Sequence, residues 1–133
     1  MTALTVVTSR STGTSLVTDI RGHDIVVDRP AAKGGGDLGP MGGELFLTAL
    51  AGCFMSNFVA AGNARELDVS AAECSVTGEL VQSPPRFESV EVRVSCDTLS
   101  AEELRHLVTV AERGCIVANT LSRGVVYQAV TAG

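Results

Sequence analysis

The longest apolar stretch of the chain lies between Glu44 and Arg65, and residues 45–64 carry no formal charge. A run of this length could cross a bilayer. Polar residues such as Asn57 and small ones such as Gly62 lower its hydrophobicity, which favours a soluble protein's interior over lipid. Apolar residues fall on two faces of a helix drawn through the run, so the pattern predicts a central helix buried on most sides, partly against a second copy of itself.

Short runs rich in β-branched residues precede this helix. They cover residues 4–8, 15–20 and 24–28, with glycines where tight turns would fall. Such spacing predicts an antiparallel meander of three strands. Residues 29–43 follow, rich in glycine and proline, and predict a loop whose backbone can approach a ligand or a partner subunit closely.

Polar and apolar residues alternate with period two after the helix, over residues 74–80 and 90–96. The turn-forming residues 82–86 join the two runs, so the pattern predicts an antiparallel hairpin with one buried face. Near the end of the chain, residues 125–131 predict a last strand.

A second amphipathic helix is predicted between this hairpin and the last strand. Ser100 and Glu103 have the spacing of a capping box, and Gly114 is a plausible end. Cys115 follows at once and opens a short helical turn over residues 116–121. The predicted elements make an α+β fold, and residues 1–133 are too few for a linker or a second core, which predicts a single domain.

Charge and composition exclude several classes of function. The net charge of −5 and scattered basic residues argue against a nucleic-acid partner. The first residues lack a basic, then apolar, secretory pattern, so we expect a cytoplasmic protein without a membrane segment. The two histidines, His23 and His106, do not cluster with cysteines at zinc spacing, and no glycine pattern matches a nucleotide loop, so neither a metal nor a cofactor is expected.

The four cysteines separate into two kinds. Cys74 and Cys96 fall on the inward phase of the predicted strands, where a thiol acts as a small buried hydrophobe. If residue 80 pairs with residue 90, these two cysteines face each other across the hairpin. Cys53 lies in the middle of the central helix, whereas Cys115 lies at a probable helix start, where free backbone N–H groups favour a thiolate. Spacing alone leaves open whether the second pair meets or is simply two more core cysteines.

Two segments resemble the OsmC/Ohr family, the osmotically inducible and organic hydroperoxide resistance proteins, and the generic OsmC-like branch in particular. Residues 21–53 are similar to the family's run of a turn, an Asp-x-Pro, glycine pairs, Gly-Pro and Glu-Leu before a helix cysteine. The sequence G-C-I-V-A-N-T-L at 114–121 is similar to its second-cysteine segment. The resemblance implies an OsmC-like α+β fold, with antiparallel sheets around the central helix, in an intertwined homodimer with active sites at the interface.

The resemblance also implies a thiol-dependent peroxidase that reduces organic hydroperoxides in oxidative stress. Cys53 matches the peroxidatic cysteine, Cys115 the resolving cysteine, and Glu44 the acidic residue near the helix start. Arg10 is the first candidate for the family's active-site arginine and Arg21 the second. Cys53 would become a sulfenic acid and then a disulfide with Cys115, which a lipoyl-type or other small dithiol reduces. The expected apolar substrate wall consists of Phe46, Leu50, Phe54 and Phe58.

Two departures from the family pattern keep a second hypothesis open. Gly42 and Ile116 stand where prolines are usual in the family, one before the acidic residue and one after the second cysteine. The alternative is a protein that keeps the fold and its cleft as a small-molecule binding or stress-associated protein without peroxidase turnover.

Overall fold

The computed structural model describes residues 1–133, which form two compact units, Met1–Phe46 and Leu47–Gly133. The chain passes from the first unit to the second inside helix α1, Gly42–Ala64. The α+β class, with small antiparallel sheets and a long central helix, is confirmed.

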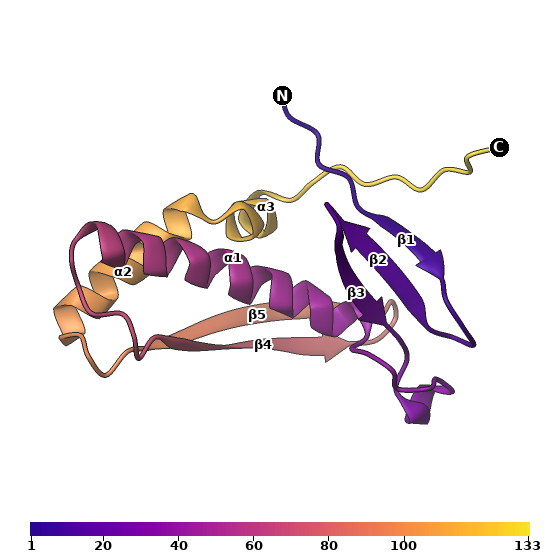
Figure 1. Ribbon diagram of the computed structural model, residues 1–133, viewed down its shortest axis with the longest axis horizontal. Helices are drawn as coiled ribbons and strands as arrows, with labels where there is room; N and C mark the ends of the chain where they lie inside the picture. The colour runs from indigo at the N-terminus through magenta and orange to yellow at the C-terminus, as the bar shows by residue number, and fades with distance from the viewer. The chain divides into compact units, whose positions relative to one another are not determined.

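The first unit contains the predicted meander (Figure 1). Its strands pair antiparallel in the order β1–β2–β3, and the hydroxyl groups of Thr8 and Thr18 lie 2.7 Å apart across β1 and β2. The first strand begins three residues later than its pattern suggests. The bounds are β1 Val7–Arg10, β2 Leu16–Ile20, β3 His23–Val27 and the short 3-10 helix η1 Ala31–Lys33.

A buried carboxylate organises the glycine-rich loop of the first unit. Asp28 is 3% exposed and accepts hydrogen bonds from the Thr14 hydroxyl at 2.6 Å and from the N–H groups of Arg29 and Leu38. The Thr14 hydrogen bond is the largest influence on the pKa of Asp28, which is lowered despite burial. Asp28 therefore ties the end of β3 to the loop that leads into α1.

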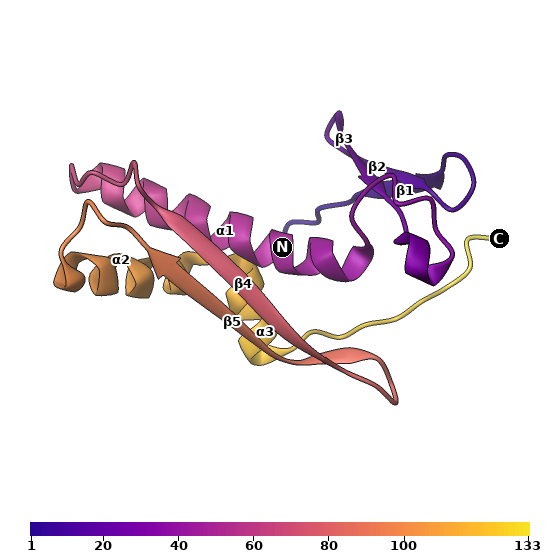
Figure 2. The ribbon, with the colours of Figure 1, turned by 90° about the horizontal axis from the view of Figure 1, so that it is seen from below.

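The second unit is built on the predicted hairpin, β4 Glu73–Val81 and β5 Arg86–Ser95. Helices α1 and α2, Ala101–Gly114, lie side by side along the hairpin (Figures 1 and 2). Gly62 allows α1 to lie close to its neighbours, because a Cβ there would fall 2.4 Å from the Val69 side chain and 3.4 Å from that of Leu107. The buried core consists of Leu50, Phe54, Phe58, Ala61, Cys96, Leu107, Ala111 and Cys115.

Helix α1 is long and apolar enough to cross a membrane by length and composition. One side of the helix packs into the second unit, where Leu50, Phe54 and Phe58 are buried in the core cluster. Only 28% of its most apolar window is buried, so the prediction of a helix buried on most sides is not met within this single chain.

The hairpin register differs from the predicted one. Val90 pairs with Gly78, and a bulge between Glu79 and Leu80 shifts the pairing near the turn. Cys74 therefore lies opposite Val94, and Cys96 lies one residue beyond the end of β5. The predicted face-to-face placement of Cys74 and Cys96 is wrong, because the register depends on where the turn falls, here with Val81 opposite Arg86, and alternation alone does not fix that position.

The capping box at the start of α2 is confirmed: the Ser100 hydroxyl accepts from the Glu103 N–H, and the Glu103 carboxylate accepts from the Ser100 N–H. Helix α3, Ile116–Arg123, follows directly. The predicted strand over residues 125–131 is absent, because no strand edge within the chain pairs with this segment. Its apolar residues are left exposed, with Val126 at 97% and Tyr127 at 83%.

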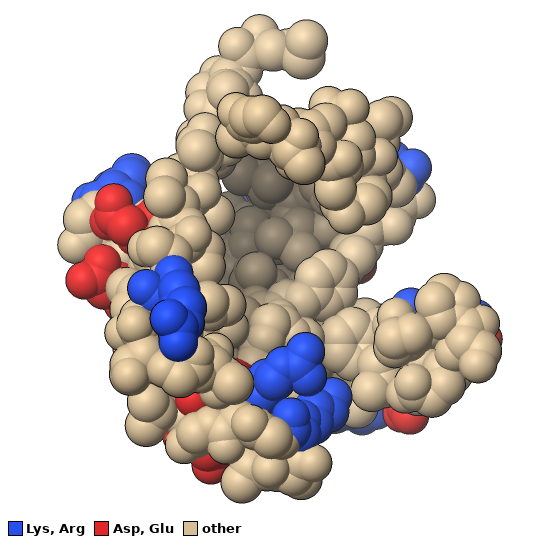
Figure 3. All heavy atoms as spheres, turned by 90° about the vertical axis from the view of Figure 1, so that its right-hand side faces the viewer, with Lys and Arg blue, Asp and Glu red and all other residues tan.

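Basic and acidic side chains are interspersed on the surface. On the face drawn in Figure 3, lysine and arginine groups are separated by uncharged surface and by carboxylates. Much of that face carries no charge, which is consistent with the 45% hydrophobic composition of the chain.

Candidate active site

The structure brings Cys53 and Cys115 together. Cys53 lies in the middle of α1 and is half-buried, whereas Cys115 is fully buried at the junction of α2 and α3. Their side chains are hydrogen-bonded to each other. Sequence spacing could not show whether the two cysteines are in contact. The packing of α1 against α2 and α3 brings them together.

The Cys53 sulfur faces the first turn of α3. Partial burial raises the pKa of this thiol, but hydrogen bonds from the Val117 N–H, from the Cys115 thiol and from the Ile116 N–H together outweigh burial. The pKa of Cys53 is therefore lowered. The N–H groups at a helix start have no partner within the helix and carry partial positive charge, so they stabilise a thiolate.

Cys115 has the opposite character. Its burial raises its pKa, and the hydrogen bond to Cys53 and the charge of the Cys53 thiolate raise it further. Its sulfur also accepts from the Ala118 N–H at 3.4 Å, so Cys115 is the cap of α3. The two shifts run in opposite directions, so Cys53 is the cysteine of the pair that loses its proton more readily.

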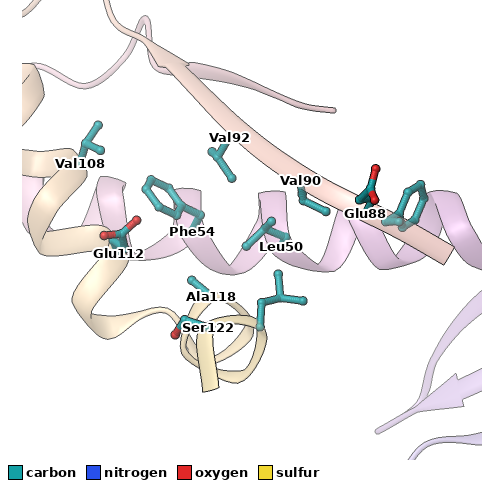
Figure 4. Close-up of a pocket in the computed structure, with 11 residues that line it drawn as sticks. Leu50, Phe54, Glu88, Val90, Val92, Val108, Glu112, Ala118 and Ser122 are labelled. Carbon is teal, nitrogen blue, oxygen red and sulfur yellow. The ribbon is translucent and has the colours of Figure 1, made fainter. Parts of the chain in front are cut away.

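An open cavity of about 490 Å³ lies among α1, β5, α2 and α3 in the second unit (Figure 4). Leu50 and Phe54, which flank Cys53 in the sequence, point from α1 into the cavity. Ala118, whose N–H binds Cys115, lines it from α3. The full lining is Leu50, Phe54, Phe87, Glu88, Val90, Val92, Val108, Glu112, Ala118, Leu121 and Ser122.

Two of the four residues predicted to form the substrate wall line the cavity, and two do not. Leu50 and Phe54 line the cavity, whereas Phe58 has no exposed surface and belongs to the core. Phe46 is 40% exposed and is the last residue of the first unit. The cavity also has walls that helix periodicity could not reveal, since Val90, Val92 and Val108 come from β5 and α2.

The charged residues predicted to take part in the active site all lie in the first unit. The Glu44 carboxylate accepts from the Met41 N–H at 2.9 Å at the start of α1. Arg10 is exposed at the end of β1, and its Nε donates to the Gly13 carbonyl at 3.3 Å. Arg21 lies in the turn between β2 and β3 with a positive φ. A role for any of these residues at the cysteines stays a prediction.

Some functional groups at the cysteine pair were not predicted. The donors to Cys53 are backbone N–H groups of Val117 and Ile116, for which side-chain identity is no guide. Asn57 was noted only as a polar interruption of an apolar helix. Its Nδ2 donates to the Cys53 carbonyl at 3.1 Å. The sequence signal for this contact is a polar residue one helical turn after the candidate nucleophile.

Cys74 and Cys96 lie elsewhere in the second unit. Burial, and then the charge of Glu73, raises the pKa of Cys74. The Cys96 thiol is 4% exposed and lies 3.2 Å from the Thr98 hydroxyl and 3.8 Å from the Asp68 carbonyl. The surroundings of Cys74 favour the neutral thiol, and the buried Cys96 thiol packs in the core cluster.

Comparisons with known proteins give a family match that covers most of the chain. Residues 34–129 match the family model described as OsmC-like protein. That range includes both cysteines of the pair, Glu44, and every residue that lines the cavity. The comparison with curated proteins finds no match to this chain.

Several solved structures share the fold. An OsmC-like protein from Mycoplasma pneumoniae has a TM-score of 0.79 at 18% identity, covering 93% of this chain and 89% of that one. An organic hydroperoxide resistance protein from Elizabethkingia anophelis has a TM-score of 0.69 at 19% identity, over 92% and 91% of the two chains. A further one from Legionella pneumophila has a TM-score of 0.64 at 18% identity, over 93% of each.

Proposed function

The chain belongs to the OsmC-like protein family, and from that premise we propose that it is a thiol-dependent peroxidase that reduces organic hydroperoxides. The observation that carries the proposal is the Cys53–Cys115 pair: two hydrogen-bonded thiols with opposite pKa shifts, one of them at a helix start. Solved structures of organic hydroperoxide resistance proteins with the same fold are consistent with a role in redox defence.

The chemistry begins at the Cys53 thiolate. It attacks the distal oxygen of the hydroperoxide, an S–O bond forms, the O–O bond breaks, and the alkoxide leaves as the alcohol after taking a proton. The Cys115 sulfur then attacks the Cys53 sulfenic acid, an S–S bond forms, and water leaves. A small dithiol, of the lipoyl type, reduces the disulfide by exchange and is itself oxidised to a disulfide.

The cavity supports an organic substrate. Eight of its eleven lining residues have apolar side chains, and burial of an alkyl chain against them stabilises binding by about 0.8 kcal/mol per methylene. Hydrogen peroxide has no such chain and gains nothing from these walls. The carboxylates of Glu88 and Glu112 also line the cavity, so it favours a neutral hydroperoxide over one that carries a carboxylate.

Anaerobic stopped-flow titration of thiols with cumene hydroperoxide tests this function. The wild-type protein should lose two thiols per equivalent of peroxide, Cys115→Ser should lose one as a sulfenic acid, and Cys53→Ser should lose none at a comparable rate. Cys74→Ser is the matched control and should behave as wild type. A wild-type protein that keeps all its free thiols would refute the proposal.

The cavity also favours a second candidate function, the binding of an apolar small molecule without turnover. That function predicts that an apolar alcohol, the product analogue, raises Tm while cumene hydroperoxide leaves the thiol count unchanged. Thiol loss at a rate that saturates with hydroperoxide concentration would reject it in favour of the peroxidase.

The proposal includes an intertwined homodimer in the cytoplasm, in which Arg10 or Arg21 and Glu44 complete the active site. Exposed apolar residues support association: Val59 on α1 is 36% exposed, and residues 125–130 lack a strand partner within the chain. Sedimentation at micromolar concentration should give a dimer mass. A monomer would refute the shared site and leave the thiol titration unaffected.

A further inference from the structure

Asn57 is a polar residue inside the most apolar helix of the protein. It is half-buried on α1, one turn after Cys53, and its Nδ2 donates to the Cys53 backbone carbonyl at 3.1 Å. This hydrogen bond fixes the orientation of the carboxamide relative to the nucleophile's own turn of helix. The side of the carboxamide that points away from α1 is then free to contact another element.

The other element is the junction between α2 and α3. A Cβ built on Gly114 would lie 3.6 Å from both Cγ and Oδ1 of Asn57 and 3.8 Å from Nδ2. The carboxamide therefore faces the Gly114 backbone with room for no more than one methyl group between them. Gly114 is the residue directly before Cys115, so Asn57 spans from the turn that carries one sulfur to the junction that carries the other.

The junction is held from α3 as well. The Asn119 side chain donates from Nδ2 to the Arg113 carbonyl at 3.1 Å, and its Oδ1 accepts from the Arg123 guanidinium at 3.0 Å. The Asn119 N–H also donates to the Cys115 carbonyl at 2.9 Å. On the side of the junction that faces α1, the Asn57 carboxamide fills the space next to Gly114.

We propose that Asn57 is a positioning residue that sets the spacing between Cys53 and the α2–α3 junction, and with it the ease of Cys53–Cys115 disulfide closure. The inference rests on the proposed function, because it concerns the resolving step of that reaction. A disulfide tolerates only a narrow range of Cα separations, usually about 4.4–6.8 Å. Small displacements of reacting groups cost large factors in rate, up to about a hundredfold for 1 Å.

The test measures the Cys53–Cys115 equilibrium in a series of dithiothreitol redox buffers, with the disulfide identified by mass spectrometry. Asn57→Ala removes both the carboxamide and its hydrogen bond, and should weaken the disulfide by about tenfold, which corresponds to about 30 mV for a two-electron couple. Asn57→Leu keeps the bulk without the donor and should fall between Asn57→Ala and wild type. Asn63→Ala, an exposed asparagine on the same helix, is the matched control and should keep the wild-type potential.

Substitution of Gly114 provides a second, independent test of the contact between Asn57 and the α2–α3 junction. Gly114→Ala alone should stay close to the wild-type potential, because its methyl group meets Asn57 at ordinary contact distance. In the Asn57→Ala background the same methyl group adds bulk to the emptied space and should move the potential back toward wild type. Residues that share a contact are expected to be non-additive in this way. Additive effects in the double variant would overturn the proposal.

Failure of the Asn57 role and failure of the peroxidase function give different results. A wild-type potential in Asn57→Ala, at a Tm that shows the variant is folded, would overturn the positioning role. The redox titration uses no hydroperoxide, so a protein that closes the disulfide but leaves cumene hydroperoxide intact would refute the peroxidase while the Asn57 comparison still decides this proposal.

Discussion

The second unit contains two pairs of cysteines whose surroundings differ in kind. Cys53 and Cys115 meet where a long helix crosses a helix start, and backbone N–H groups of α3 lower the pKa of Cys53. Cys74 lies on a strand, where burial and a neighbouring carboxylate raise its pKa, and Cys96 lies just past a strand end. Four chemically identical side chains therefore differ in the groups that surround each sulfur.

The physical reason is the backbone. In a strand the N–H groups lie in the plane of the sheet, whereas the side chains stand roughly perpendicular to it, so they do not point at the sulfur of a strand cysteine. A helix start has N–H groups without intrahelical partners, and a thiolate that faces them gains hydrogen bonds. The lowered pKa of Cys53 follows from its proximity to such a helix start.

The largest expected contrast is in turnover. Cys53→Ser should lower the steady-state rate of cumene hydroperoxide reduction with a dithiol by at least about a thousandfold, because it removes the nucleophile. Cys74→Ser should change the rate by less than about twofold, since it does not touch the pair. Coupled consumption of the dithiol measures both. A Cys53→Ser variant with substantial activity would place the nucleophile elsewhere.

Loss of the second cysteine should have an intermediate effect. Cys115→Ala removes the intramolecular thiol, so resolution must come from the external dithiol, and turnover should fall on the order of a hundredfold. Excess peroxide should then carry Cys53 to the sulfinic acid, which intact-mass spectrometry detects as two added oxygens. The Cys96→Ala variant should show no such overoxidation.

The pH dependence should separate Cys53 from Cys74. The pKa of Cys53 is lowered, so its thiolate persists as pH falls until the pH passes that pKa, whereas Cys74 stays protonated to higher pH. Iodoacetamide at neutral pH should therefore label Cys53 at least about tenfold faster than Cys74. Peptide mapping over a pH series measures both midpoints, and a midpoint for Cys53 at or above that of Cys74 would contradict the comparison.

The smallest expected effect is on stability. Cys96→Ala removes a buried thiol and its contacts with Thr98 and Asp68, and should lower the free energy of unfolding by about 1 kcal/mol. The rate of Cys53 alkylation should not change. Urea unfolding measures the first and peptide mapping the second. A Cys96→Ala variant of full stability but altered Cys53 reactivity would reverse the roles assigned to the pairs.

Much of the fold could be predicted from the sequence, because the relevant information is local. Alternation identified the hairpin, the Ser100–Glu103 spacing identified the start of α2, and an uncharged apolar run identified the central helix. The strand predicted over residues 125–131 failed, because strand-forming residues describe a segment able to pair but cannot supply an edge to pair with. The hairpin register failed because alternation does not fix where the turn falls: Val90 pairs with Gly78 and not with residue 80.

The sequence by itself determined that Cys53 lies in an apolar helix and that Cys115 lies at a helix start, since both follow from neighbouring residues. Only the tertiary structure decided that the two sulfurs meet, that the N–H groups of Val117 and Ile116 face Cys53, and that Asn57 faces Gly114. These contacts depend on how α1 packs against the α2–α3 junction. That packing is set by side chains far apart in the chain, whose distances no local pattern encodes.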